Sequence, residues 1–480
     1  MEPRKIAFHT LGCKLNFSET STISRQFEND GFIQVAFSEV ADIYVINSCS
    51  VTNNAEKRCK SLIRQVMRNN PDASVTVIGC YSQISPEELS AIPGVALVLG
   101  NADKFNLLEH IQQLDRDKKA GMAIQGSLNG PSEAIGDPFK KYNPKQTHDP
   151  NQKRDPGVDA DESSDQQTST QSSTSVRSLK NERFIPSWSM DGRTRSFFKI
   201  QDGCDYFCTY CTIPLARGHS RSDTIAATIR SARQIAGTNT KEIVLSGVNI
   251  GDFGKLHQES LYDLLKELIT VDGIDRIRIS SIEPDLLHDR IIELVAEHPR
   301  LMPHFHIPLQ SGSDEVLKAM GRRYDTSLFF NRIETIRKHI PHACIAVDLI
   351  VGFPNETEAL FKESYEFIKQ ADVSYIHVFT YSERDNTRAL NLANHIPVAE
   401  RHNRSQQMHS LSEQKKNYFY LSNKGRKEKI LWENDMKDNY LYGFTENYIR
   451  AKTKYDPALI NTIQSVMLNH LDNDGVYIIA

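Results

Sequence analysis

The hydrophobic positions of the first 120 residues alternate between short apolar runs and longer helical patterns. Apolar runs of strand length lie at 5–11, 42–46, 74–78 and 95–99. Helical patterns lie between them, for example at 18–29 and 55–69. Strands that are separated by crossover helices pair in parallel with right-handed connections. The pattern therefore predicts an open parallel α/β sheet domain in residues 1–120.

A second alternating series begins near Ser196. Its strand candidates lie at 197–200, 242–245, 276–280, 304–308, 345–351 and 374–380, with helical patterns between them. Six strand–helix units suit an open, partial (β/α)6 barrel, because a closed barrel of eight units needs a longer chain. After Ala399 come a basic helical stretch and short strand-like runs at 430–432, 440–444 and 448–451, which predict a small β domain.

A polar segment separates the two series. Between residues 143 and 178 the chain is rich in Asp, Ser, Gln, Thr and Lys, and Val158 and Val176 are its only aliphatic residues larger than alanine. Such a segment buries too little apolar surface to offset its ordering entropy. The chain of 480 residues is therefore divided into a first domain (1–120), a polar linker or insertion (121–183), a second domain (184–420) and a third domain (421–480).

Charge and hydropathy exclude several classes of protein. Lysine and arginine number 57 against 61 acidic residues, a formal net charge of −4, so the chain is not a wholesale basic protein, although a local basic surface remains possible. No window approaches about 18 uncharged apolar residues, and the first residues lack the apolar region of a secretory signal. We expect a cytoplasmic protein, in which the eight cysteines are ligands, nucleophiles or buried residues rather than disulfides.

Three cysteines lie on one short stretch that follows the first strand of the second series. Cys204, Cys208 and Cys211 have the spacing C-x3-C-x2-C. Three thiolates can hold three irons of a [4Fe–4S] cube, and the fourth iron then binds a small molecule such as S-adenosylmethionine. Reductive cleavage of that sulfonium gives a radical able to attack an unactivated C–H bond. The alternative is a zinc loop, which needs a fourth ligand that the neighbouring sequence does not provide.

Three further cysteines each follow the end of a candidate strand in the first domain. Cys13 follows the run 5–11, Cys49 follows 42–46 and Cys80 follows 74–78. The carboxyl ends of parallel strands meet at one edge of a sheet, where ligands bind. We therefore expect a second three-cysteine cluster site. The alternative is three unrelated buried cysteines, which is also how we interpret Cys59 and Cys344.

These motifs together resemble the radical S-adenosylmethionine methylthiotransferases over nearly the whole chain outside residues 120–183. The matching stretches are 11–16 (LGCKLN), 47–52 (NSCSVT), 79–83 (GCYSQ) and 211–218 (CTIPLARG). The residues of these stretches are similar to those of the MtaB-type tRNA enzymes, whereas the MiaB-type branch carries Gln-Met in place of Lys14-Leu15. Ser48 and Asn386 depart from the family pattern, which commonly has threonine and glycine there. The resemblance implies a cluster domain, a radical core and a C-terminal TRAM-like antiparallel β-barrel.

The resemblance also implies a reaction. It is the conversion of N6-threonylcarbamoyladenosine at position 37 of the tRNA anticodon loop into its 2-methylthio form. Two [4Fe–4S] clusters would divide the work: one S-adenosylmethionine supplies the methyl group and another supplies the radical. The alternatives are the same reaction on N6-isopentenyladenosine-37 and a non-catalytic iron–sulfur RNA-binding protein. We expect a monomer that takes electrons from a donor such as flavodoxin or ferredoxin.

Several side chains at strand ends are candidates for the cofactor cavity. The resemblance suits Ser246, Gly247 and Glu283 to the amino group and ribose of the cofactor and Gln310 to the cavity floor, with Tyr210 on the adenine. The set assigned to cofactor binding is Tyr210, Ser246, Gly247, Glu283, Gln310, Asp348 and Phe353. The alternative for each polar member is a satisfied strand-end residue.

Arg322 and Arg323 suit a carboxylate, either that of the threonyl substrate or that of a structural ion pair. His304 and His306 share one face of a strand, which we expect to face the barrel interior because no third metal ligand is evident.

A basic stretch near the predicted third domain is the candidate RNA surface. Its basic residues are interleaved with Tyr418, Phe419 and Tyr420, a combination that suits phosphate contact and base stacking. The basic members are Lys415, Lys416, Lys424, Arg426, Lys427 and Lys429, and Tyr448 and Arg450 are further candidates in the tail. The alternative is a solvated helix face with a packed apolar side.

Overall fold

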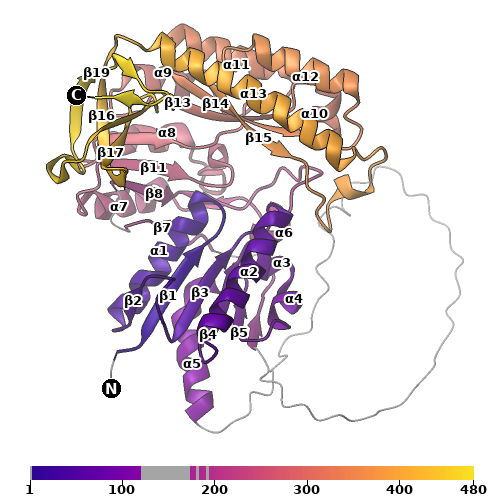
Figure 1. The fold of residues 1–480 in the computed structure, drawn as a ribbon, viewed down its shortest axis with the longest axis vertical. Helices are drawn as coiled ribbons and strands as arrows, with labels where there is room; N and C mark the ends of the chain where they lie inside the picture. Colours follow the sequence, from indigo (N-terminus) through magenta and orange to yellow (C-terminus); the bar gives the residue numbers. More distant parts are fainter. Residues whose placement is uncertain (1–2, 120–172, 180–182, 191–193, 480) are drawn as a thin grey trace, which may run out of the picture.

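The computed structural model describes residues 3–119, 173–179, 183–190 and 194–479. An N-terminal sheet (indigo to purple in Figure 1) lies below a partial barrel (pink to orange), and a curled C-terminal sheet (yellow) lies at one end of that barrel. None of the described helices is long and apolar enough to cross a membrane. The α/β fold class predicted above is confirmed.

The N-terminal sheet has the order β2-β1-β3-β4-β5-β6, and all of its strand pairs are parallel. Its strands are β1 (Lys5–Thr10), β2 (Ile33–Val35), β3 (Ile43–Ser48), β4 (Ser74–Gly79), β5 (Val95–Leu99) and β6 (Ser173–Ser175). Four of them were predicted. The edge strands β2 and β6 were missed because both are short and only partly buried. β6 lies near the end of the polar segment and pairs with β5 at the edge of the sheet; residues 120–172 lie outside the described part of the chain, and the linker or insertion stays a prediction.

Helices cover both faces of this sheet. They are α1 (Lys14–Asn29), α2 (Asn53–Asn69), α3 (Cys80–Ile84), α4 (Pro86–Ser90), the short η1 (Lys104–Asn106) and α5 (Leu107–Lys119). The hydroxyl of Thr52 caps α2 by accepting from the amide of Ala55. α1 starts directly after Cys13, which places its N-terminus at the cysteine edge of the sheet. Two apolar clusters fill the space between the sheet and its helices.

The central domain is the predicted partial barrel of six parallel strands. They are β8 (Arg195–Lys199), β11 (Glu242–Ser246), β12 (Arg276–Ile279), β13 (His304–Gln310), β14 (Cys344–Val351) and β15 (Tyr375–Thr380). Single bridges, Ile277 to Leu301 and Ser281 to His306, join the β12 side to the β13 side. The short β7 (Ser187–Trp188) adds an antiparallel edge beside β8. One large apolar cluster lies between the strands and their helices.

The remaining elements of the central domain surround these strands. The helices are α6 (Ile213–Arg217), α7 (Ile225–Ala236), α8 (Leu261–Leu268), α9 (Asp289–Glu297), α10 (Asp314–Met320), α11 (Thr326–His339), α12 (Glu358–Gln370) and α13 (Val398–Ser422). A small antiparallel pair, β9 (Gln201–Asp202) and β10 (Arg221–Ser222), follows β8. The 3-10 turns are η2 (Ile250–Asp252), η3 (Lys255–His257) and η4 (Arg388–Asn391).

The C-terminal domain is a curled sheet of order β19-β16-β17-β18-β21-β20. Its elements are β16 (Lys427–Lys437), β17 (Tyr440–Thr445), β18 (Arg450–Lys454), η5 (Pro457–Leu459), β19 (Ile463–Met467), β20 (His470–Leu471) and β21 (Tyr477–Ile478). The β18–β21 pair is parallel, a departure from the purely antiparallel expectation. Phe419 and Tyr420, at the end of α13, pack into its core beside Trp432. These two aromatics are therefore structural, which corrects their assignment to the RNA surface.

Candidate active site

The loop from Cys204 to Cys211 runs between β9 and α6. Gly203 precedes it with φ +70°, and a Cβ there would lie 1.9 Å from the carbonyl oxygen of His219, so only glycine fits. The amide of Cys204 donates to the Gly218 carbonyl (3.0 Å), and that of Cys211 to Cys208 (3.1 Å). These bonds curl the loop so that its three cysteines lie within electrostatic reach of one another.

Burial, and then the neighbouring Cys208, raise the pKa of Cys211 to about 12. Burial also raises the pKa of Cys204 and Cys208. Three thiolates this close repel one another unless a cation joins them. The loop therefore fits a positively charged metal centre that three thiolates hold together.

The structure brings Cys13, Cys49 and Cys80 together at the carboxyl edge of the N-terminal sheet. Cys49 directly follows β3, and Cys80 directly follows β4. A Cβ on Gly12 (φ +95°) would lie 2.9 Å from the Cys49 Sγ, so the turn before Cys13 packs directly on that thiol. Burial, and then the charges of Cys80 and Cys13, raise the pKa of Cys49 to about 12. The three cysteines of this second set, like those of the first, are free thiols.

A buried ionic network lies between the two cysteine sets. Glu19 of α1 is fully buried and pairs with Lys104 (2.6 Å), Lys199 (3.0 Å) and Arg217 (3.1 Å). Although burial raises the pKa of Glu19, these cations hold it below its ordinary value. Arg217 also pairs with Asp202 (2.9 Å). The network joins α1 of the N-terminal domain to β8, β9 and α6 of the central domain.

Arg217 also serves the N-terminal cysteines. Its guanidinium donates to the Asn16 Oδ1 (2.6 Å), and the charges of Cys80 and Cys13 act on it. The Asn101 Nδ2 lies 3.6 Å from the Cys80 Sγ and 2.6 Å from the Ala216 carbonyl oxygen. The α6 segment therefore supplies a positive charge and a backbone contact to the N-terminal set.

Arg322 is committed to the loop of the central domain. It pairs with Glu283, donates to the Cys208 Sγ (3.1 Å) and contacts the hydroxyl groups of Tyr324 (3.0 Å) and Tyr210 (3.5 Å). Arg322 thus forms an ion pair within the protein, and its role toward a substrate carboxylate stays a prediction. Burial raises the pKa of Glu283. A guanidinium donor to a ligand sulfur stabilises the thiolate and any cluster that it holds.

Arg323 lies on the outside of the same loop. It donates to the Asp205 carbonyl oxygen (2.7 Å), and its guanidinium carbon lies 4.0 Å from the centre of the Tyr206 ring. The Tyr206 hydroxyl donates to Asp285 (2.6 Å). Arg323 thus braces the cysteine loop, and its role toward the substrate stays a prediction.

The other cofactor candidates fall into two groups. The Ser246 hydroxyl is buried and donates to the Val244 carbonyl (3.0 Å), so its hydrogen bond lies within its own strand. A Cβ at Gly247 would lie 2.8 Å from the Gln201 Oε1, which accepts from the next two backbone amides. Phe353 is fully buried and packs on Tyr210, with ring centres 6.2 Å apart.

The second group consists of half-buried residues, of which three contact other side chains through their polar groups: Tyr210, Glu283, Gln310 and Asp348. Gln310 has φ +69° where a bulge ends the β13–β14 pairing. Positive φ at a glutamine is uncommon and turns its side chain away from the ordinary direction of the strand.

A His–Asp–His group lies inside the barrel. The His306 Nε2 lies 2.8 Å from the Asp348 Oδ1, and the ring of His377 is 5.2 Å from that of His306. One ligand atom from each of these residues lies within 4.8 Å of the others. This corrects the expectation that no third ligand accompanies His306. His304 instead packs on Tyr448, with ring centres 4.7 Å apart.

The tail residues assigned to RNA divide between surface and interior. Lys424, Arg426, Lys427 and Lys429 are exposed at the junction of α13 and β16, and Tyr418 is 72% exposed beside them. Arg450 is half-buried, 3.3 Å from Asp435. Lys415 donates to the Lys369 and Ala371 carbonyl oxygens, so its ammonium caps the end of α12.

Tyr448 faces the barrel. Its ring stacks on Phe444 with centres 4.6 Å apart, and the guanidinium of Arg278 lies 4.8 Å from its centre. Tyr448 thus joins the C-terminal sheet to the central domain, and this contact accounts for its burial.

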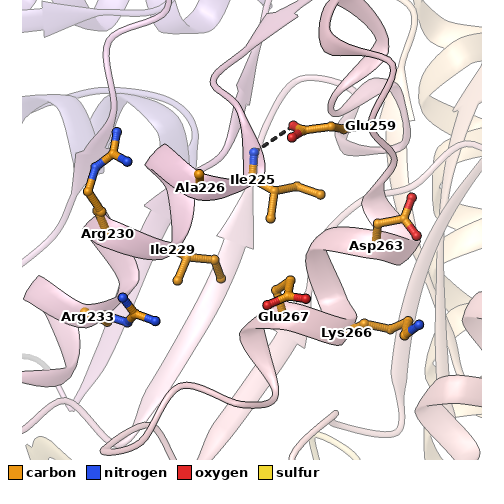
Figure 2. A pocket seen from close by; sticks show the side chains of 9 residues that line it. All are labelled: Ile225, Ala226, Ile229, Arg230, Arg233, Glu259, Asp263, Lys266 and Glu267. Atoms are coloured by element: carbon orange, nitrogen blue, oxygen red, sulfur yellow. Dashed lines mark hydrogen bonds between the residues drawn. The ribbon is translucent and has the colours of Figure 1, made fainter.

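A separate pocket lies between α7 and α8 (Figure 2). The carboxylate of Glu259 accepts from the backbone amide of Ile225 (2.7 Å) at the start of α7. The pocket is lined by Ile225, Ala226, Ile229, Arg230, Arg233, Glu259, Asp263, Lys266 and Glu267. It contains no predicted site residue and is not part of the candidate active site.

Comparison with known proteins follows the same division of the chain. Residues 5–100 match the model of "Uncharacterized protein family UPF0004", and residues 198–368 match the Radical SAM superfamily. The solved structure of TsrM from Kitasatospora setae, a radical S-adenosylmethionine methyltransferase with cobalamin and a [4Fe-4S] cluster bound, has a TM-score of 0.51. It is 12% identical, with 81% of this chain and 74% of that chain covered, and shows the shared fold.

Curated relatives match over nearly the whole chain. The threonylcarbamoyladenosine tRNA methylthiotransferase MtaB of Bacillus subtilis is 34% identical over 96% of this chain and 93% of its own length. The MtaB of Thermotoga maritima is 32% identical over 98% and 96%. The tRNA-2-methylthio-N(6)-dimethylallyladenosine synthase of B. subtilis is 28% identical over 92% and 79%. This chain therefore belongs to the MtaB-type tRNA methylthiotransferases of the radical SAM superfamily.

Proposed function

We propose that this protein converts N6-threonylcarbamoyladenosine at position 37 of tRNA into its 2-methylthio form. The observation that carries the proposal is the pair of three-cysteine sites, one in each of two domains that the Glu19–Arg217 network holds together. The MtaB relatives support the threonylcarbamoyl substrate, and they match at higher identity than the dimethylallyl relative.

The residues present fit two [4Fe–4S] clusters. Burial raises the pKa of Cys49 in one set and of Cys204, Cys208 and Cys211 in the other, and binding of the thiolates to iron relieves this penalty. When bound, the clusters and S-adenosylmethionine supply the radical, the sulfur and the methyl group. Cys13, Cys49 and Cys80 would hold one cluster, and Cys204, Cys208 and Cys211 the other.

The chain's own cations balance these sites. Arg217 supplies positive charge to Cys13 and Cys80, and Arg322 donates to Cys208. The side chains of both arginines are at most 3% exposed, so their charges are only weakly screened by solvent. They would hold the thiolates in the orientation that the irons require.

S-adenosylmethionine would lie at the strand ends beside the Cys204–Cys211 loop. Glu283, Gln310, Asp348 and Tyr210 offer it polar or aromatic groups, whereas Ser246, Gly247 and Phe353 would shape the cavity through the backbone and packing. The exposed Lys424, Arg426 and Lys427, together with Arg450, would contact tRNA phosphates. We further propose that the enzyme is a cytoplasmic monomer that receives electrons from a flavodoxin or ferredoxin. Its domains would span residues 1–120, 184–420 and 421–480.

The test is product formation by the anaerobically purified protein with its clusters. Anticodon stem-loops that carry threonylcarbamoyladenosine or dimethylallyladenosine are digested after reaction and analysed by mass spectrometry. We expect the methylthio product from the threonylcarbamoyl RNA, and none after Cys204→Ala or Cys49→Ala. Cys344→Ala is the matched control, because Cys344 is buried at the start of β14 and no cysteine of either set is among the groups that act on it. Product from the dimethylallyl RNA alone, or bound RNA without any product, would contradict the proposal.

A further inference from the structure

Lys14 directly follows Cys13 and begins α1, yet its side chain reaches into the barrel. The charged groups that act on its ammonium include Arg195, Arg278 and Asp348, which lie on β8, β12 and β14. Lys14 is half-buried. A residue of the N-terminal domain therefore contributes a charge to the interior of the central domain.

The carboxylate of Asp348 acts on the Lys14 ammonium from a distance, but no anion contacts it in the described part of the chain. Among the residues that the structure describes, it forms neither a hydrogen bond nor an ion pair. Its charged neighbours have contacts of their own: Arg195 pairs with Glu433, Arg278 pairs with Glu242 (2.8 Å), and the Asp348 Oδ1 lies 2.8 Å from the His306 ring nitrogen. An ammonium withdrawn from water without a contacting anion is costly. Lys14 thus has donors left that a bound anion would accept.

Neither the N-terminal cysteines nor a bound cation explains why a positive charge lies at the position of Lys14. The cysteines have their own cation in Arg217, on which the charges of Cys80 and Cys13 act. The His306–Asp348–His377 group has a spacing that would suit a metal ion, but Lys14 faces it, and its charge acts on His377. A positive charge beside such a group disfavours a cation and favours an anion.

Lys14 lies between the two cysteine sets. Along the chain it adjoins Cys13. Inside the barrel it interacts with Asp348, whose charge also acts on Glu283, and Glu283 in turn acts on Cys204. A nucleoside that reacts with sulfur from one set and a radical from the other must lie in this space. The threonylcarbamoyl group ends in a carboxylate, whereas the dimethylallyl group carries no charge.

We propose that Lys14 binds the threonyl carboxylate of the substrate nucleoside and thereby selects the threonylcarbamoyl over the dimethylallyl substrate. The inference rests on the proposed function and adds to it the residue that recognises the N6 substituent. The ammonium forms a charge-assisted hydrogen bond with the carboxylate, and the hydrocarbon part of a dimethylallyl group offers no partner for it. Lys14 is then a specificity residue that touches the substrate but takes no part in the bond-making step.

The test measures binding by the complete enzyme, with its clusters, under anaerobic conditions and at fixed salt. Two anticodon stem-loops are compared by fluorescence anisotropy: one with threonylcarbamoyladenosine, and one in which its carboxylate is a methyl ester. The wild type should bind the acid about 10- to 100-fold more tightly than the ester. Lys14→Met and Lys14→Gln should bring this ratio close to one, and Lys14→Arg should keep most of it. Lys338→Met, on the exposed face of α11, is the matched control and should leave the ratio unchanged.

Three results would overturn the inference: a wild-type ratio near one, a wild-type ratio that both neutral variants retain, or an equal loss of affinity for the two RNAs. The last would identify Lys14 as a phosphate contact or a structural residue. Iron content and circular dichroism of each variant establish that it is folded and loaded. Product formation by the wild type tests the proposed function separately, so an enzyme that makes product but ignores the carboxylate overturns only the inference.

Discussion

Replacement of Glu19 by glutamine would leave a buried cation without its anion. Glu19 contacts Lys104 (2.6 Å), Lys199 (3.0 Å) and Arg217 (3.1 Å), and all four side chains are at most 1% exposed. Lys199 and Arg217 would still have Asp202, whereas Lys104 would keep only the amide oxygen of Asn101 (2.7 Å). The cost is therefore that of about one unpaired buried charge, roughly 3–5 kcal/mol.

A loss of this size lowers the melting temperature of a domain of this length by about 6–20 °C, at about 2–4 °C per kcal/mol. Thermal unfolding followed by circular dichroism under reducing conditions measures it. Glu28→Gln, on the exposed end of the same helix, is the control and should change little. The double variant Glu19→Gln/Lys104→Met removes the stranded cation and should recover part of the loss. A shift of Glu19→Gln no larger than that of Glu28→Gln, or a double variant less stable than the single one, would refute this reasoning.

Three further predictions concern the other charged and strained positions. Although burial raises the pKa of Glu242, Arg278 lowers it to about 2; its contribution to stability is complete above the unfolded-state pKa of about 4.3 and is lost as the pH falls toward 2. The free energy of unfolding, measured with urea at several pH values, should therefore fall less steeply below about pH 4 in Glu242→Gln than in the wild type. An equally steep fall in both proteins would contradict this. Gly203→Ala, whose methyl group would collide with a backbone carbonyl, should lower the bound iron to that of one cluster; full iron content would show that the loop tolerates it. Arg322→Lys should make the reduction potential of its cluster more negative in a redox titration followed by electron paramagnetic resonance, because the donation to Cys208 is weakened.

Much of the chemistry could be predicted from local patterns. The spacing of Cys204, Cys208 and Cys211 restricts them to one short loop whatever the rest of the chain does. Cys13, Cys49 and Cys80 are distant in sequence, but each follows a strand, and parallel strands end at one edge. The periodicity of the buried strands β3 and β14 similarly predicts the two α/β domains. In these cases the physical rule acts within one element or between strands of known direction.

Contacts between elements were beyond the reach of such rules. His377 joins His306 and Asp348 only through the registers of β13, β14 and β15. Arg322 pairs with Glu283 although a carboxylate ligand was equally compatible with its position in the sequence. Phe419 and Tyr420 resemble an RNA-stacking motif but fill the core of the C-terminal sheet. Each outcome depends on which side chains of distant segments lie next to the residue in the folded protein.

The sequence by itself determined the two sets of metal-binding thiols, the order of the domains and the class of reaction, because these depend on residue type, short spacing and strand periodicity. Tertiary structure alone decided how the charges are arranged: Glu19 pairs with three cations from two domains, Arg217 lies beside the N-terminal cysteines, and Lys14 forms no ion pair with any residue that the structure describes. The energy of a buried charge depends on distances of a few ångströms to other charges. Only the folded arrangement of the domains sets those distances.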